Sequence, residues 1–197
     1  MLHHKIIAIT GGIGAGKSVV SAILATMGYH VYDCDSQAKR LMNSSPIIKK
    51  ELVSRFGTNI FNADGLLNKE LLSSIIFGNA DALACVNSIV HPAVRDDIAQ
   101  WVQEHHHTAD PLFVETALLK EGGIHTMVQE VWHIVAPLET RVTRVMRRNT
   151  TSRDKVMERI ASQQPLKVPQ ALKLVEIIND DITPLLPQIF KALNHCQ

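Results

Sequence analysis

The segment GGIGAGKS, residues 11–18, constrains the fold more than any other part of the chain. Its glycines can adopt backbone conformations with positive φ, which leave several backbone N–H groups pointing into one concavity. A mostly β-branched run, residues 5–10, precedes the segment, and apolar residues at helical spacing follow it. A strand, a glycine-rich loop ending in Lys-Ser and a helix are the parts of a phosphate-binding loop. The segment therefore predicts a nucleotide-binding protein with residues 5–10 as the central strand of a parallel sheet.

Further apolar runs alternate with helical patterns along the chain. We expect strands within residues 30–35, 111–116, 131–137 and 174–181, whereas residues 35–107 have mostly helical periodicity. Pro92 lies inside the last of these helices and should kink or divide it. Because strands that alternate with helices imply right-handed βαβ crossovers, the pattern predicts an α/β fold with a five-stranded parallel sheet.

The composition excludes several classes of protein. The chain has 197 residues, of which 46% are hydrophobic and 20% charged, and its formal net charge is +1, so no overall field attracts nucleic acid or an anionic membrane. The cysteines, Cys34, Cys85 and Cys196, have no CxxC spacing, which argues against a disulfide framework or a structural zinc site. Since the sequence has no signal-peptide core and no apolar run of about 18 residues, we expect a cytoplasmic protein without nucleic-acid, membrane or obligate protein partners.

The phosphate-binding loop predicts roles for its own residues. The Lys17 ammonium can reach the β- and γ-phosphates of a nucleotide, and the Ser18 hydroxyl can coordinate Mg²⁺. A chance glycine-rich turn would need neither the strand before it nor the helix after it. The loop alone does not separate kinases from nucleotide switches, motors and transporter ATPases. The residues expected to bind the nucleotide phosphates are Gly11, Gly12, Ile13, Gly14, Ala15, Gly16, Lys17, Ser18 and Val19.

An acidic pair follows the second predicted strand. Asp33 and Asp35 are two residues apart, so in a strand both side chains would point to one face, at the carboxyl end where open α/β sheets bind ligands. A carboxylate there would repel a phosphate acceptor but could orient an alcohol and accept its proton. We therefore expect an alcohol acceptor, with Asp35 as the base and Asp33 as its structural neighbour. The alternative is that the pair only caps the following helix.

Three arginines share one face of a predicted helix. Arg141, Arg144 and Arg148 are spaced i, i+3 and i+7, while Val142 and Val145 fall on another face and can pack inward. Such an arginine face can clamp the transferring phosphoryl group or the nucleotide as part of a lid. The alternative is an ordinary solvated face.

Other candidates carry weaker signals. The histidines at 105–107 are expected to mark a solvated helix end, because consecutive side chains on a helix diverge and do not converge on a metal. Cys34 is expected to be a small buried side chain. Glu115, at the end of the third predicted strand, could reach a Mg²⁺ shell through water, or could serve only packing or capping.

With these motifs in order, the sequence resembles the dephospho-CoA kinase family along nearly its whole length. TGGIGAGKS is similar to that family's phosphate loop, DCD to its D-x-D motif and DGLLNKELLSSIIF to its helical substrate motif. Later segments also resemble family motifs, namely VNSIVHP, LLKE and IIND. TRVMRR with RDKVMERIASQ resembles the family's arginine lid, which ends in glutamine. The phosphate loop alone is widespread, but the ordered set is specific.

The resemblance implies transfer of the ATP γ-phosphoryl group to the ribose 3′-hydroxyl of dephospho-CoA, the last step of coenzyme A synthesis. By matching positions, it implies Asp35 as the base, His91 in acceptor binding, Arg144 and Arg148 at the nucleotide and lid, and Asn179 near the adenine. ATP and Mg²⁺ are the implied cofactors.

Two positions depart from the family pattern. Ala117 stands where the family usually has proline, which alters backbone stiffness. Lys69 stands where it usually has arginine, so an acceptor contact there keeps its charge but loses the bidentate fork.

The implied fold is a three-layer P-loop kinase fold made of one domain, residues 1–197. A helical substrate-binding insertion is expected at about 36–107 and a helical lid at about 141–165. The alternatives are another P-loop kinase, for a nucleoside, shikimate or a sugar acid, or a guanine-nucleotide switch. Guanine-specific switches usually carry the pattern N-K-x-D. The only Asn-Lys pair here, Asn68 and Lys69, is followed by Glu-Leu, which disfavours a switch.

Overall fold

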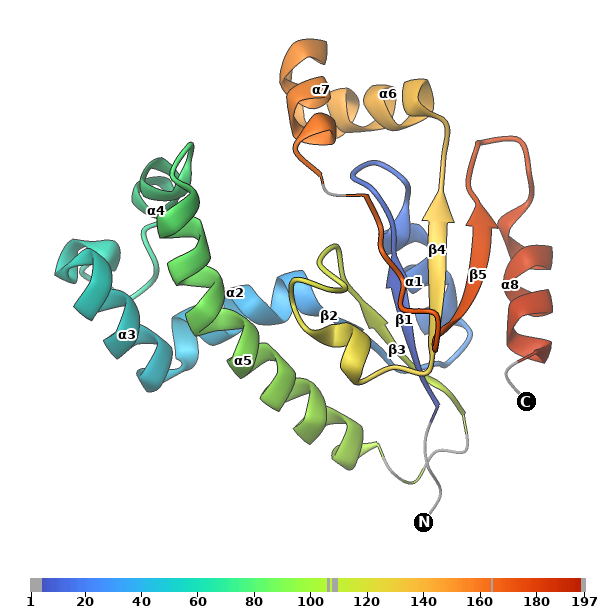
Figure 1. The fold of residues 1–197 in the computed structure, drawn as a ribbon, viewed down its shortest axis with the longest axis horizontal. Coiled ribbons are helices and arrows are strands. Elements are labelled where there is room, and N and C mark those ends of the chain that lie inside the picture. Colours follow the sequence, from blue (N-terminus) through green and yellow to red (C-terminus); the bar gives the residue numbers. More distant parts are fainter. Residues whose placement is uncertain (1–4, 106, 108–109, 164, 196–197) are drawn as a thin grey trace. The chain divides into compact units, whose positions relative to one another are not determined.

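The computed structural model describes residues 5–105, 107, 110–163 and 165–195. The chain forms two compact units (Figure 1). The first, which we call the sheet unit, contains Met1–Tyr32 and His105–Gln197. The second, Asp33–Glu104, contains helices and is called the helical unit.

One five-stranded sheet forms the centre of the sheet unit. Its strands are β1 (Ile6–Thr10), β2 (Val31–Asp33), β3 (Leu112–Glu115), β4 (Glu130–Val135) and β5 (Lys173–Ile178). The strand order is β2-β3-β1-β4-β5. Strand β1 runs parallel to β3 and to β4, and β5 runs parallel to β4. The predicted α/β fold and the central position of residues 5–10 are confirmed.

The main core lies between this sheet and two helices, α1 (Lys17–Thr26) and α8 (Leu185–Asn194). Ile7 and Ile9 of β1 are fully buried and pack in one cluster with Leu24 of α1 and Ile189 of α8. Burial of each such side chain contributes about 1.5–3 kcal/mol. This packing fixes where β1 ends, and therefore where the loop after it begins.

A smaller core joins the helices α6 (Leu138–Asn149) and α7 (Arg153–Ala161). Val142, Val145 and Val156 are buried against each other. The expected inward packing of Val142 and Val145 is confirmed, and it turns the arginine face of α6 away from this core. A short 3-10 helix, η2 (Ile124–Thr126), lies in the connection between β3 and β4.

The helical unit contains α2 (Cys34–Ser44), α3 (Pro46–Phe56), the 3-10 helix η1 (Thr58–Ile60), α4 (Lys69–Ile76) and α5 (Ala80–Glu104). In α5, four aliphatic side chains at every fourth position are buried, namely Val86, Val90, Val94 and Ile98. Pro92 lies within α5 and does not divide it, contrary to one form of the prediction. A proline inside a helix costs roughly 3 kcal/mol, which is less than the roughly 6 kcal/mol or more that four buried aliphatic side chains contribute.

One sequence prediction at the start of the helical unit needs correction. Strand β2 ends at Asp33, so Asp35 is not on a strand but in the first turn of α2. The reason is that the Asp33 carboxylate accepts hydrogen bonds from the N–H groups of Asp35 (3.0 Å) and Ser36 (3.3 Å), as a helix N-cap does. The two carboxylates therefore do not share a strand face, and the capping role of Asp33 is confirmed.

At the other end, α5 ends at Glu104, directly before His105, so the helix end expected there is confirmed. His106 lies outside the described residues. Cys34 is buried, as expected, while Cys196 also lies outside the described residues.

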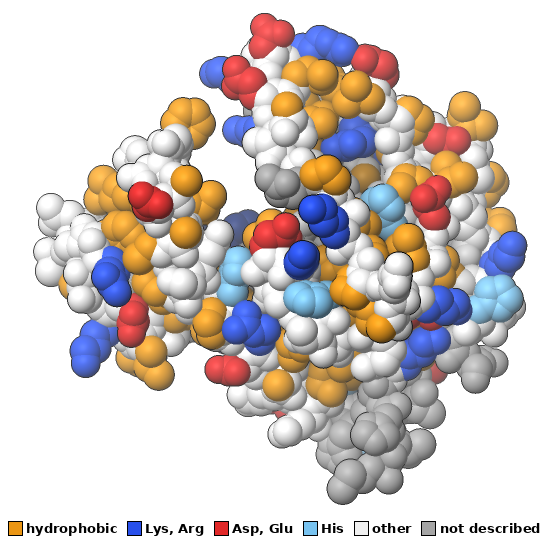
Figure 2. Space-filling view, in the orientation of Figure 1, with side chains coloured by type: hydrophobic (Ala, Val, Ile, Leu, Met, Phe, Trp, Pro, Cys, Tyr) orange, Lys and Arg blue, Asp and Glu red, His pale blue; other side chains and the backbone are white. Residues whose placement is uncertain are grey.

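Charged side chains of both signs are interspersed on the face drawn in Figure 2. Among the described residues, no helix has the length and apolar character needed to cross a bilayer.

Candidate active site

The loop between β1 and α1 adopts the conformation that its glycines predict. Gly14 has a φ of +78° and Gly16, the N-cap of α1, has a φ of +95°. A Cβ atom at Gly14 would lie 2.6 Å from the carbonyl oxygen of Arg141, so the loop passes too close to α6 for a side chain there. In the first turn of α1, the Val19 and Val20 N–H groups donate to the carbonyl oxygen of Gly16, whereas the Ser18 N–H has no acceptor within the helix. Such an N–H group and the helix dipole favour an anion at the start of α1.

Lys17 and Ser18 are the first two residues of α1. Lys17 is half-buried, and its Nζ donates to the carbonyl oxygen of Gly11 at 3.0 Å, so its side chain folds back along the loop. The Ser18 side chain is exposed in the first turn. The described residues contain no cluster of three or more metal-ligating side chains. The hydroxyl oxygen of Ser18 suits Mg²⁺, a hard cation that commonly completes its shell with phosphate and water oxygens.

Asn179, just after β5, binds the backbone of the loop through its side chain. Only 7% of it is exposed, and its Nδ2 donates to the carbonyl oxygen of Ala15 at 2.8 Å. A Cβ atom at Gly16 would collide with this amide, which is a second reason for glycine there. The Asn179 side chain thus holds the backbone of the loop.

Arg144 of α6 also reaches the loop. Its guanidinium group donates to the carbonyl oxygens of Gly14 (3.3 Å) and Ala15 (3.4 Å). It also donates to Asn179 Oδ1 (3.1 Å) and pairs with Asp181 at 2.5 Å. Arg144 is therefore held by two hydrogen bonds to the phosphate-binding loop and by two contacts with the residues after β5.

Arg148 lies one turn further along α6 and differs from Arg144. It is exposed, and its one hydrogen bond among the described residues is to the side chain of Asn149, at 3.2 Å. Of these two arginines, the structure brings Arg144 to the loop and leaves Arg148 in solvent.

Arg141, which the sequence placed on the arginine face, and Gln163, which it did not assign as a site residue, both contact the tip of the loop. The Arg141 Nε donates to the carbonyl oxygen of Ile13 at 2.9 Å, and the Ile13 N–H donates to Gln163 Oε1, also at 2.9 Å. Arg141 and Gln163 are joined at 3.3 Å. Burial lowers the pKa of Arg141. Its place on the arginine face was a usable signal, whereas only the family's terminal glutamine pointed to Gln163.

The remaining candidates lie on three helices of the helical unit. Asp35 is exposed in the first turn of α2, and Lys69 is exposed at the start of α4. His91 is half-buried on α5.

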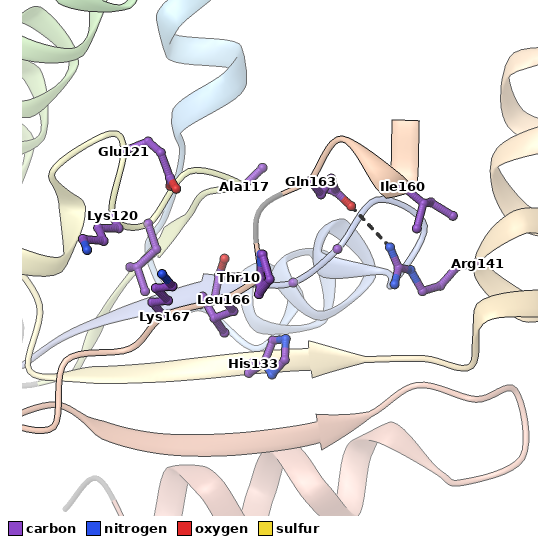
Figure 3. A pocket seen from close by; sticks show the side chains of 14 residues that line it. Thr10, Ala117, Lys120, Glu121, His133, Arg141, Ile160, Gln163, Leu166 and Lys167 are labelled. Atoms are coloured by element: carbon purple, nitrogen blue, oxygen red, sulfur yellow. Dashed lines mark hydrogen bonds between the residues drawn. The ribbon is translucent and has the colours of Figure 1, made fainter. Parts of the chain in front are cut away.

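A cavity of about 600 Å³ opens beside the loop in the sheet unit (Figure 3). Gly11 and Gly12 line it together with residues from the β3–η2 connection, from β4 and from the segment after α7. His133 of β4 lies in its wall, where burial and the nearby charge of Arg141 lower the histidine pKa against the opposing effect of Glu176. The His133 ring is therefore neutral at pH 7.

Comparisons with known proteins match this chain to dephospho-CoA kinases. A family model described as dephospho-CoA kinase matches residues 5–183. A protein named dephospho-CoA kinase from Bacteroides fragilis is 40% identical over 187 residues, which cover 95% of this chain and 90% of the relative. One from Carboxydothermus hydrogenoformans is 35% identical over 92% of this chain and 87% of its own length.

Two solved structures share the fold of this chain. A crystal structure from Thermus thermophilus superposes with a TM-score of 0.75 at 34% identity, covering 98% of this chain and 96% of that one. A dephospho-CoA kinase from Campylobacter jejuni shares the fold, with a TM-score of 0.69 at 21% identity and 98% coverage of both chains.

Proposed function

Because the chain belongs to the dephospho-CoA kinase family, we propose that it transfers the γ-phosphoryl group of ATP to the ribose 3′-hydroxyl of dephospho-CoA, giving coenzyme A and ADP. The observation that carries this proposal is the phosphate-binding loop, whose glycines have the expected positive φ. Asn179 holds the loop through a hydrogen bond to Ala15, and both residues lie within the family match over residues 5–183. The family is one of transferases in coenzyme A biosynthesis. An aqueous compartment such as the cytoplasm suits this substrate.

The nucleotide is bound at the start of α1. The backbone N–H groups of the loop and the helix dipole hold the β- and γ-phosphates, and the Lys17 ammonium leaves its contact with Gly11 to neutralise their charge. Arg148, which is exposed, is available to contact the phosphoryl group as charge develops on its oxygens. Arg144 acts from its fixed place against the loop.

Ser18 would hold Mg²⁺, whose chemistry when bound is to neutralise charge on the phosphate oxygens. The exposed hydroxyl at the first turn of α1 fits this use, since it offers a hard oxygen ligand next to the phosphates. Glu115, at the end of β3, remains a candidate for an outer contact through water.

The acceptor is bound by side chains of the helical unit. Asp35 orients the 3′-hydroxyl and takes its proton, while the hydroxyl oxygen bonds to the γ-phosphorus and the bond from that phosphorus to the β–γ bridging oxygen breaks. His91 and Lys69 contact the acceptor elsewhere. Lys69 contributes a point charge in place of the planar guanidinium group usual in the family.

The experiment compares the wild type with Asp35→Asn in ATP, Mg²⁺ and dephospho-CoA, following both ADP and the 3′-phosphorylated product. Loss of a general base should lower kcat by ~10²–10⁴-fold, with a loss near the lower end if the proton leaves late and positioning dominates. The Asp35→Asn melting temperature should be unchanged, because Asp33 is the cap of α2. Full activity of Asp35→Asn would refute the base, and a wild type inactive on dephospho-CoA would refute the substrate.

A further inference from the structure

The cavity beside the phosphate-binding loop has two lysines that the nucleotide roles do not use. Lys120 comes from the β3–η2 connection and Lys167 from the segment after α7, so two distant stretches of sequence each place one lysine at the same cavity. Figure 3 shows both lysines on one side of the cavity, with Thr10 between them and Arg141. Neither ammonium group has a hydrogen-bond or ion-pair partner among the described residues.

The charge of this cavity is positive. Its described lining contains Lys120, Lys167 and Arg141 against one carboxylate, Glu121, and the neutral His133 adds no charge at pH 7. Arg141 already donates to Ile13 and Gln163. The two lysines are therefore the cations of the lining that remain available to donate to a ligand, and Arg141 adds its charge to theirs.

The structure of the acceptor requires a second anion site close to the point of transfer. Dephospho-CoA carries a diphosphate at C5′ of the same ribose whose 3′-hydroxyl is phosphorylated, so the sugar ring keeps the two groups a few bonds apart. Gly11 and Gly12 begin the loop that binds the transferred phosphoryl group, and both line the cavity that contains the lysines. A volume of about 600 Å³ is also sufficient for part of a small-molecule ligand.

We propose that Lys120 and Lys167 bind the 5′-diphosphate of dephospho-CoA. This inference rests on the proposed function and identifies the part of the acceptor that the sheet unit recognises. Lysine ammonium groups bind phosphate as compact point charges. Removing them leaves the diphosphate without its counter-charges, whereas the nucleoside part of the acceptor keeps its contacts. The two lysines thus select acceptors with an anionic 5′ substituent over plain nucleosides.

The test measures steady-state kinetics of Lys120→Ala, Lys167→Ala and the double variant. Because charged hydrogen bonds are lost, the KM for dephospho-CoA should rise about tenfold or more in the double variant, while the KM for ATP stays the same. Adenosine, used as a competitive inhibitor against dephospho-CoA, has the 3′-hydroxyl but no diphosphate, so its inhibition constant should not change. The double Lys→Arg variant should restore most of the affinity, since it restores both charges.

Lys191→Ala serves as the matched control, because Lys191 is exposed on α8 and does not line the cavity. An unchanged KM for dephospho-CoA in the double alanine variant overturns the proposal, and so does an equal rise in the KM for ATP or in the inhibition constant of adenosine. The wild type is assayed first. If it does not phosphorylate dephospho-CoA, the proposed function is wrong. If the wild type is active and the double variant has the same KM for dephospho-CoA, only the role of the lysines is wrong.

Discussion

At the amino end of the sheet, the charge of the fully buried Glu130 is paired with lysines of the protein itself, whereas at the carboxyl end the start of α1 offers polar groups to a ligand. The Glu130 carboxylate pairs with Lys5 at 2.9 Å and with Lys173 at 3.3 Å, and it accepts a hydrogen bond from Trp132 Nε1 at 2.8 Å. These contacts join the beginnings of β1, β4 and β5.

At the carboxyl end of the sheet, the protein's own contacts go to the backbone of the phosphate-binding loop. There the protein binds the carbonyl oxygens of the loop, at Ile13, Gly14 and Ala15, through Arg141, Arg144 and Asn179. The loop is held by its acceptors, which leaves donors at the start of α1 for phosphate oxygens. Contacts that satisfy a polar group contribute to stability, and groups left for a ligand contribute to function. Substitutions at the two ends should therefore separate stability from activity.

The largest effect on activity is expected for Lys17→Ala. The Lys17 side chain is not part of the hydrophobic core, so the melting temperature should change little. Loss of its charge at the phosphates should lower kcat/KM by ~10²–10³-fold. Turnover assays and a thermal melt of the same preparation measure both quantities. A stable variant with near wild-type kcat would break the proposed division between the two ends.

A smaller and more informative effect is expected from the pair Arg148→Ala and Arg144→Ala. Arg148 is exposed, so its removal should lower kcat/KM by ~10–100-fold with no loss of stability. Arg144 has two hydrogen bonds to the loop and contacts with Asn179 and Asp181, so its removal should cost about 1–3 kcal/mol of stability and lower kcat/KM less. Chemical denaturation and kinetics of both variants test this. Equal stability losses in the two would show that the contacts of Arg144 do not hold the loop.

The smallest effect on activity is expected for Glu130→Gln. Burial acts to raise the pKa of Glu130, but hydrogen bonds from Lys5 and Trp132 and the charge of Lys5 together lower it below its ordinary value. A lowered pKa in the folded state means that the ionised carboxylate stabilises the fold above the ordinary pKa of about 4.3. This contribution to stability is lost as the pH falls from the ordinary pKa through the lower pKa of Glu130 in the folded protein.

Glu130→Gln should therefore lose about 1–3 kcal/mol of stability at pH 7. The difference from the wild type should shrink as the pH falls below the ordinary pKa of a glutamate. Denaturation curves at several pH values measure this, and kcat at pH 7 should stay unchanged because Glu130 is far along β4 from the loop. A pH-independent difference would contradict the assigned cause, and a large loss of kcat would contradict the separation of the two ends.

The sequence by itself determined the features that depend on neighbouring residues. The β-branched run before the glycines predicted β1, the positive-φ glycines predicted the loop, and the spacing of Val142 and Val145 predicted the buried side of α6. Hydrophobic periodicity and glycine patterns are local, so they can be recognised without knowing what packs against them.

Only the tertiary structure decided what surrounds the loop. Gln163 binds Ile13 across 150 residues of sequence and Asn179 binds Ala15 across 164, and no local pattern announces such contacts. The capping of α2 by Asp33 placed Asp35 on a helix where alternation predicted a strand, because two backbone hydrogen bonds outweighed the strand pattern. Pro92 stayed within α5 because packing along the buried stripe outweighed one lost hydrogen bond. In each case the deciding energy came from a partner whose position depends on how the chain folds.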